Sequence, residues 1–202
     1  MNVQPLQEMV KLDLHKPIWD NFFWVSPLTV VGTLEEDGTP NLAPKHMATP
    51  MGWQNYFGFV CTPRHSTYRN AARDRVFTVS MPRPDQVVLA SLCAAPRCDD
   101  SAKPEIEALQ TRPATRVKGV FLAQSYLFLE CELDRIVDGF GDNSLIVGRI
   151  VEAAVAPDSM RSLERDEQDL VHEAPLLAYL QPWRFARIQQ TYAFPLPEGF
   201  ER

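Results

Sequence analysis

A short polar segment, 62–70 (TPRHSTYRN), combines the residue types that bind an anion. It places Arg64 and two hydroxyl side chains, Ser66 and Thr67, just before a helix that the sequence predicts to begin near Tyr68. Unpaired backbone N–H groups at a helix start, hydroxyl donors and a guanidinium fork together suit a phosphate. The alternative interpretation is simple capping of the helix by Ser66 or Thr67, with Arg64 in solvent.

A second segment, 41–47 (NLAPKHM), follows a strong turn signal at Asp37-Gly38. Pro44 cannot donate to a strand ladder, so backbone groups beside it are left free for a ligand. Lys45 and His46 add side-chain donors at the same place. The alternative interpretation is an ordinary edge strand with a lysine and a histidine facing solvent.

Composition limits the class of partner. The chain has 202 residues, of which 45% are hydrophobic and 23% charged, the balance of a globular protein. Its net charge is −6, whereas a protein that binds nucleic acid through its overall field is normally basic. We therefore expect no nucleic acid as partner, and since no apolar run is long enough to span a membrane, we expect no membrane either. An acidic total still allows one local cationic pocket for a phosphorylated small molecule.

Common cofactor and metal motifs are missing from the sequence. It contains no GxGxxG, GxxxxGK[ST], HExxH, GxSxG or CxxC pattern, so we expect no metal site. Cys61 and Cys131 stand in apolar runs, where cysteine is usually a small buried hydrophobe. Cys93 and Cys98 flank a turn that contains proline, and a redox pair is the alternative for them. With no signal-peptide layout and no membrane-length apolar run, we expect a reduced, soluble, cytoplasmic protein.

The elements that must position these residues are mostly short strands. Alternation, β-branched runs and turn signals predict strands at 28–34, 41–48, 55–61, 76–81, 126–136, 144–156 and 184–188. Pro44 predicts that the second of these lies at a sheet edge or carries a bulge. Short helices are expected from Tyr68 onward, at 86–95 and at 104–109.

The pattern lacks the regular βαβ alternation of a doubly wound parallel sheet. It indicates a mainly β protein with helical excursions, an antiparallel barrel, in a single domain over 1–202. We place the core at about 28–155 and a C-terminal extension at 156–202. The aromatic segment 17–25 is expected to pack on the core, and 157–173 to be a solvated excursion. The tail 176–194 is expected to add one turn of helix before its strand.

Together the two polar segments resemble the signature of the flavin reductase-like family, the FMN-binding split barrels. That family has a strand ending in Thr, an Asp/Glu-Gly turn, an Asn-x-x-Pro segment, and a Lys/Arg-x-Ser/Thr-Thr-x-x-Asn phosphate motif before a helix and an F-x-V strand. The matching residues here are Thr33, Asp37-Gly38, Asn41, Ala43-Pro44, Arg64, Thr67, Asn70 and Phe77-Val79. Farther on, 131–151 resembles the family's Gly-Asp-His turn and following strand. The resemblance spans about 28–155.

The resemblance implies a homodimeric, six-stranded antiparallel split barrel that holds FMN near the subunit interface. It implies that the FMN phosphate binds at Arg64, Ser66, Thr67 and Asn70 and that the flavin ring lies along 41–47. The implied cofactor-binding residues are Asn41, Leu42, Ala43, Pro44, Lys45, His46, Met47, Thr62, Arg64, Ser66, Thr67 and Asn70. Met47 or Trp53 would supply an apolar face for the ring.

The function that this resemblance implies is an FMN-dependent oxidoreductase. Electrons would pass from NADH or NADPH through the flavin to a second acceptor, with a partner oxygenase as one candidate. No side chain is assigned as catalytic; His46 is a candidate donor near the flavin. Asn143 stands where the family has the histidine thought to lie near the nicotinamide, which favours the alternative of an FMN-binding electron carrier or sensor. A barrel that has lost flavin and binds another phosphorylated ligand, or serves as a scaffold, is the remaining alternative.

Overall fold

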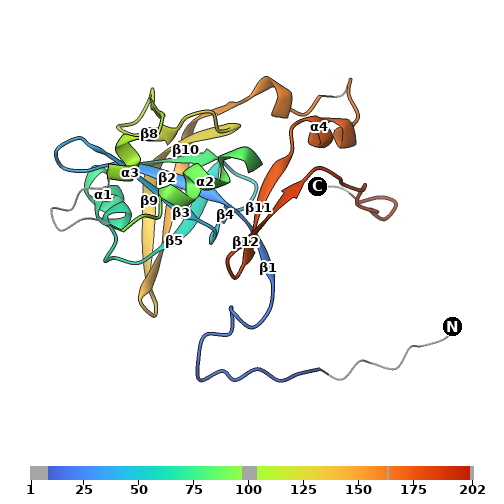
Figure 1. The fold of residues 1–202 in the computed structure, drawn as a ribbon, viewed down its shortest axis with the longest axis horizontal. Helices are drawn as coiled ribbons and strands as arrows, with labels where there is room; N and C mark the ends of the chain where they lie inside the picture. The colour runs from blue at the N-terminus through green and yellow to red at the C-terminus, as the bar shows by residue number, and fades with distance from the viewer. Residues whose placement is uncertain (1–8, 97–103, 163, 201–202) are drawn as a thin grey trace.

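A seven-stranded antiparallel sheet forms the body of the protein. The structure, a computed structural model, describes residues 9–96, 104–162 and 164–200. The strand order is β3-β2-β6-β9-β10-β5-β4 (Figure 1). These strands are β2 (Thr29–Leu34), β3 (Pro40–Lys45), β4 (Ala48–Pro50), β5 (Tyr56–Cys61), β6 (Val76–Met81), β9 (Leu127–Phe140) and β10 (Asn143–Val155). The mainly β, split-barrel class is confirmed, with seven strands in this sheet instead of six.

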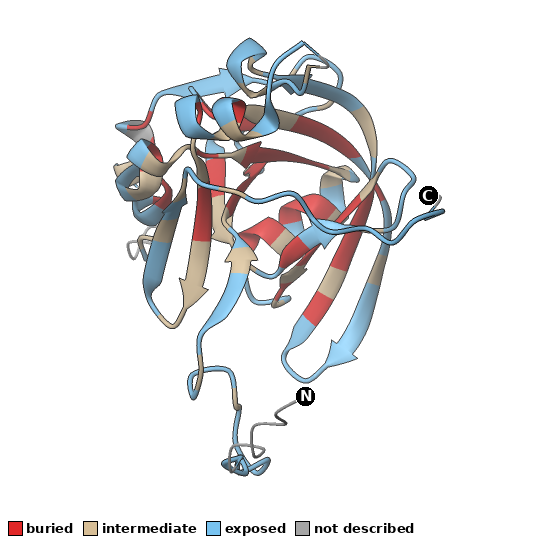
Figure 2. Cartoon of the chain, turned by 90° about the vertical axis from the view of Figure 1, so that its right-hand side faces the viewer, coloured by how far each residue is buried: buried red, intermediate tan, exposed pale blue. Residues whose placement is uncertain are grey.

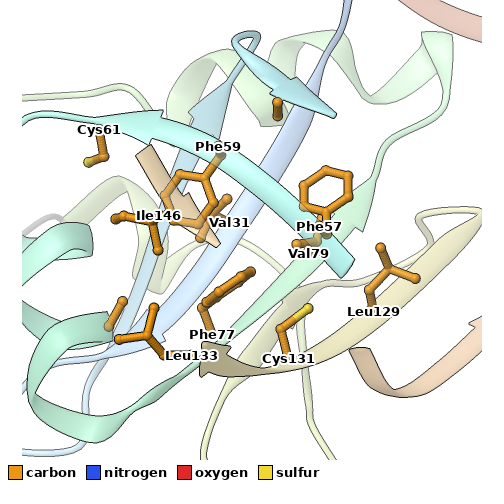
Figure 3. Close-up of a cluster of buried hydrophobic side chains, with 12 residues drawn as sticks. Val31, Phe57, Phe59, Cys61, Phe77, Val79, Leu129, Cys131, Leu133 and Ile146 are labelled. Atoms are coloured by element: carbon orange, nitrogen blue, oxygen red, sulfur yellow. The ribbon is translucent and has the colours of Figure 1, made fainter. Parts of the chain in front are cut away.

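The sheet curls around one hydrophobic core. In sheet order β9 and β10 separate β5 from β6, yet the rings of Phe59 on β5 and Phe77 on β6 meet edge to face at 5.1 Å between centroids (Figure 3). Both rings are fully buried, as are Cys61 and Cys131. The prediction that these two cysteines act as buried hydrophobes is confirmed, and burial raises the pKa of the Cys131 thiol.

A second core lies on the outer face of β2 and β3. Val31 points into the first core, whereas its neighbour Val30 points into the second, so both faces of β2 are buried. This explains the continuous apolar run of β2. The outer core is covered by α2 (Val87–Leu92), α3 (Pro104–Glu107) and β8 (Val120–Leu122), which pairs with β7 (Thr111–Pro113).

Most elements of the barrel follow the sequence pattern. β2, β5 and β6 lie where the sequence predicts strands, and β3 is an edge strand, as Pro44 indicates. β9 and β10 form the expected long hairpin. The remaining short elements are α1 (Ser66–Asp74), two 3₁₀ turns, η1 (Pro84–Gln86) and η2 (Pro157–Ser159), and α4 (Glu167–Glu173). Among the described residues of 157–173 only Leu170 is buried, so the prediction of a solvated excursion is confirmed.

Two predictions about the ends of the chain are wrong. Residues 176–181 form a strand, β11 (Leu176–Gln181), and not a turn of helix; it pairs with β12 (Arg184–Ile188) and with β1 (Trp24–Pro27) in a separate three-stranded sheet. The aromatic segment does not pack on the core, since Phe23 and Trp24 remain 67% and 52% exposed. Pairing of β1 with a strand from the far end of the chain overrides the local apolar signal.

A carboxylate on the outer face of β9 fastens the loop between β7 and β8. The alternation of β9 suggests a solvent-facing Glu130, but its side chain is only 4% exposed. Its oxygens accept hydrogen bonds from the backbone N–H groups of Thr115, Arg116 and Val117 at 2.8, 2.6 and 2.9 Å, and from the Thr115 hydroxyl. Burial alone would raise the pKa of Glu130; the hydrogen bonds outweigh it, and the pKa lies below its usual value.

Glu130→Gln is therefore expected to lower the free energy of unfolding at pH 7 by about 3 kcal/mol, because an amide turns N–H donors toward the backbone N–H groups. A carboxyl whose pKa is lowered on folding stabilises the protein above its unfolded value, here 4.5, and loses that contribution as the pH falls through the folded pKa. Urea denaturation at pH 7 and at acidic pH measures both effects. The control is Glu132→Gln on the same strand, whose half-exposed side chain pairs with Arg149 and should cost less than ~1 kcal/mol. Equal losses in the two variants would contradict this account.

Candidate functional site

A cavity of about 380 Å³ opens between the edge strand β3, the start of α1 and the segment that follows α2. Seven residues singled out from the sequence line it together: Asn41, Ala43, Pro44, Lys45, Arg64, Ser66 and Thr67. The other lining residues are His65, Arg69, Cys93, Ala94, Ala95 and Pro96. Among these residues, all within the described part of the chain, there is no aspartate or glutamate. The cavity is thus a local cationic site on an acidic protein.

The first residues of α1 line this cavity. The helix begins at Ser66, two residues before the predicted position, and His65 is its N-cap residue without a side-chain capping bond. The interpretation in which Ser66 or Thr67 caps the helix is therefore wrong, since both are already inside it. The first N–H groups of a helix have no partner within the helix and carry its positive dipole end. The Tyr68 N–H donates to the His65 carbonyl at 3.1 Å, whereas Ser66 and Thr67, the first two residues of the helix, line the cavity, where their N–H groups suit an anion.

Two arginines flank these donors in different ways. Arg64 is 75% exposed and its Nη2 lies 2.6 Å from Asp142 Oδ2, in the turn between β9 and β10. Arg69 donates from Nη1 to the Arg64 carbonyl at 2.5 Å and from Nη2 to Ser66 Oγ at 3.0 Å. Sequence reasoning missed Arg69, although its position three residues after Ser66 puts both on one face of the helix.

A buried network fixes the helix start against the two neighbouring strands. Thr33 Oγ1 on β2 accepts hydrogen bonds from Asn41 Nδ2 at 2.9 Å and from Asn70 Nδ2 at 3.2 Å. Asn41 Nδ2 also lies 3.2 Å from Thr67 Oγ1. All four side chains are 2% exposed. Asn70 does not line the cavity; it positions α1, and Arg73 holds its Oδ1 at 3.1 Å.

The other residues expected at the site lie around the cavity or away from it. Leu42 points into the outer core and is fully buried. Thr62 Oγ1 accepts a hydrogen bond from the Arg64 N–H at 3.5 Å, and Met47 is 44% exposed. His46 turns away from the cavity and stacks on Tyr179 of β11 at 4.7 Å between centroids. Burial lowers the pKa of His46 and so favours the neutral imidazole.

Cys93 is buried and donates to the Leu89 carbonyl, and Cys98, its suggested redox partner, lies outside the described residues. Within the described residues, no group of three His, Cys, Asp or Glu side chains could hold a metal ion. No helix in that same part of the chain is long and apolar enough to cross a membrane.

Comparison with known proteins decides the family. The model of the flavin reductase like domain matches residues 24–179. The chain belongs to this family. Membership supports a flavin-related oxidoreductase and confirms the resemblance seen in the sequence.

Several relatives share the domain. An uncharacterised protein of Methanothermobacter thermautotrophicus is 27% identical over 158 residues, which cover 75% of this chain and 73% of the relative. The solved structure of nitrilotriacetate monooxygenase component B from Bacillus cereus has a TM-score of 0.78 at 16% identity, covering 93% of this chain and 100% of the other. The FMN-binding protein from Thermus thermophilus, solved with bound p-hydroxybenzaldehyde, has a TM-score of 0.70 at 19% identity, covering 96% and 100%. These two likenesses show the shared fold.

The turn that resembles the second signature of the flavin reductase-like family lies next to the cavity. Gly141 and Asp142 connect β9 to β10, which begins at Asn143, and the Asp142 carboxylate pairs with Arg64. Asn143, which stands in place of the family's histidine, is exposed. Two segments whose contacting residues are 78 positions apart in the sequence, recognised separately by their patterns, are thus in direct contact.

Proposed function

We propose that this flavin reductase-like protein is an FMN-dependent oxidoreductase, which passes electrons from NADH or NADPH through the flavin to a second acceptor. The observation that carries the proposal is the cavity itself. It joins the N-terminus of α1 and three cationic side chains, Lys45, Arg64 and Arg69, to the free edge of β3. A dianionic phosphate monoester matches the first part, and a flat ring with carbonyl oxygens matches exposed strand backbone. The name of the Thermus thermophilus protein also supports FMN.

In this proposal the phosphate binds at Arg64, Arg69, Ser66 and Thr67, and Asn70 holds the helix in place. The ring extends along β3 from Ala43 toward Met47, where Pro44 interrupts the strand donors. The cavity of about 380 Å³ is within the usual range for small-molecule sites. Bound FMN supplies hydride and electron transfer. The protein contributes orientation and charge, with backbone donors favouring an anionic reduced ring.

The test of this function is the visible spectrum of the purified protein. We expect the absorption bands of protein-bound oxidised flavin, either as isolated or after addition of FMN and desalting. Anaerobic addition of NADH or NADPH should then bleach these bands rapidly. A protein that stays colourless after FMN addition refutes the flavin site and favours another phosphorylated ligand or a scaffold.

A second candidate function is an FMN-binding electron carrier or sensor. The exposed Asn143 favours it, because the family's histidine at this position is implied to lie near the nicotinamide. A yellow protein that neither nicotinamide bleaches, but that a chemical reductant such as dithionite does, would select this candidate. The exchange Asn143→His should then raise the rate of bleaching by NADH or NADPH.

We further propose that 1–202 acts as one domain and that the active unit is a homodimer. The name of the Bacillus cereus protein, an oxygenase component, supports a partner oxygenase as the acceptor of the reduced flavin. The buried thiols of Cys61 and Cys131 are in keeping with a reducing cytoplasm.

A further inference from the structure

The protein exposes far more surface than a compact monomer of its mass. Its accessible area is 14,017 Å². A compact monomer of 22.9 kDa is expected to expose only ~9,600 Å². The difference exceeds the area that each chain of an obligate homodimer buries, about 1,000–2,500 Å². The chain as a whole therefore exposes area that a second molecule could cover.

The N-terminal arm, which we define as residues 9–23, is a mostly exposed segment of the described chain. It runs away from the body of the protein below β1 (Figure 1) and is coloured almost entirely as exposed (Figure 2). Its large side chains are apolar: Met9 and Val10 are 85% exposed, Leu14 81% and Phe23 67%. Trp19 is 45% exposed, and between ring centroids it lies 6.2 Å from Phe22 and 6.0 Å from Trp24, where the arm meets β1 of the same chain. Apolar residues gathered in this way mark an interaction site.

A matching apolar surface lies on the three-stranded sheet. In its register Trp24 is opposite Gln181 and Phe185 is opposite Tyr179. Residues opposite one another, and residues two apart on a strand, share a face, so Trp24 and Phe185 lie on the same face. Both are 52% exposed, and Trp183 in the β11–β12 turn is 89% exposed. We call Trp24, Trp183 and Phe185 the platform.

We propose that the N-terminal arm of each copy packs on the platform of a second copy, so that two arms clasp a symmetric dimer. One chain carries both the apolar arm and the apolar platform, and the arm points away from its own body (Figure 1). If each arm packs on the platform of the other copy, both apolar surfaces are buried. The two identical contacts are then related by a two-fold axis. The inference rests on the homodimer of the proposed function and is independent of the flavin.

The clasp closes next to the candidate site. Lys45, the last residue of β3, lines the cavity, and the following residue, His46, stacks on Tyr179 of the platform sheet. Tyr179 shares a sheet face with Phe185. The arm of the second copy therefore lies at the end of β3 toward which the proposed flavin ring extends.

Two variants of the full chain test the clasp by light scattering or sedimentation equilibrium. The arm variant is Trp19→Ser/Phe23→Ser, and the platform variant is Trp183→Ser/Phe185→Ser. Wild type is expected at twice 22.9 kDa at micromolar concentration. Buried interface aromatics are typical hot spots, and each substitution occurs twice in the dimer, so we expect either variant to raise the dimer Kd about 100- to 1,000-fold. All these side chains are exposed within one chain, so both variants should still fold, and they should unfold at the midpoint that wild type shows when it is diluted below its dimer Kd. Phe140→Ser, a similarly exposed position at the end of β9, is the matched control and should stay dimeric.

Mixing the two variants distinguishes exchange between copies from folding back within one chain. A heterodimer of arm variant and platform variant keeps one intact arm–platform pair, whereas each homodimer keeps none. We expect dimer to reappear in the mixture at concentrations where each variant alone is monomeric. No recovery in the mixture would overturn the clasp in favour of contact within one chain. A dimeric arm variant would overturn the clasp and leave the homodimer standing; a monomeric wild type would overturn both.

Discussion

Replacing Arg64 by alanine is expected to weaken FMN binding by roughly ten- to a hundredfold and to leave riboflavin binding unchanged. Hydrogen bonds to a charged group are worth about 1.5–3 kcal/mol, and each 1.4 kcal/mol is about tenfold in Kd. Arg64 lies at the cavity beside the α1 N-terminus, and its side chain already holds an anion, the Asp142 carboxylate. Riboflavin has the same ring as FMN but no phosphate. Titration of both ligands by flavin fluorescence measures the selectivity.

The control is Arg161→Ala, which removes an arginine that is 80% exposed and paired with Glu167, far along the chain from the cavity. It changes the net charge by the same amount and should leave FMN binding within a factor of about two. Raised salt should reduce the affinity for FMN more than that for riboflavin. If Arg64→Ala weakens both ligands equally, or neither, Arg64 does not bind the phosphate.

Gly32→Ala is expected to lower the free energy of unfolding by more than ~3 kcal/mol, the largest effect on stability that we foresee. A Cβ at this position would lie 1.9 Å from the Val120 carbonyl oxygen and 2.4 Å from Thr78 Oγ1. These atoms cannot move aside easily, because Thr78 Oγ1 is within 2.5 Å of the Val120 oxygen and 3.3 Å of the Gly32 oxygen. Making room for the methyl group means lifting β8 from β2. Thermal unfolding should shift down by about 6 °C or more.

The matched control is Gly38→Ala in the β2–β3 turn. Gly38 has a φ of 85° and no atom within 4 Å of the added Cβ. Alanine there should lower the free energy of unfolding only through the strain of a left-handed backbone conformation, about 1–2 kcal/mol. Gly32→Ala should therefore be clearly the less stable of the two. A Gly32→Ala variant as stable as Gly38→Ala would show that β8 moves freely and that the close approach has no structural importance.

The sequence by itself determined the elements whose pattern is local. The apolar run of β2, the turn at Gly38, the edge position imposed by Pro44 and the alternation of β9 each depend on neighbouring residues only. The family signature is also local, which is why it located both segments of the cavity and why the residues alone were enough to recognise the flavin reductase-like family. Some local signals misled: the helix begins at Ser66, so the hydroxyls of Ser66 and Thr67 do not cap it. The aromatic segment 17–25 does not pack on the core, and 176–181 forms a strand and not a turn of helix.

Only the tertiary structure decided which of these residues meet. It turned His46 from the cavity onto Tyr179, made Asn70 a support of α1 through Thr33, and brought Asp142 to Arg64. It also buried Glu130 under a loop whose backbone N–H groups bind the carboxylate. Such a contact leaves no side-chain pattern in the sequence. Each of these contacts joins residues far apart along the chain, and their geometry depends on how the sheet curls and which strands pair. Local periodicity carries no information about either, and so the site residues were recognisable by type but their roles followed from the fold.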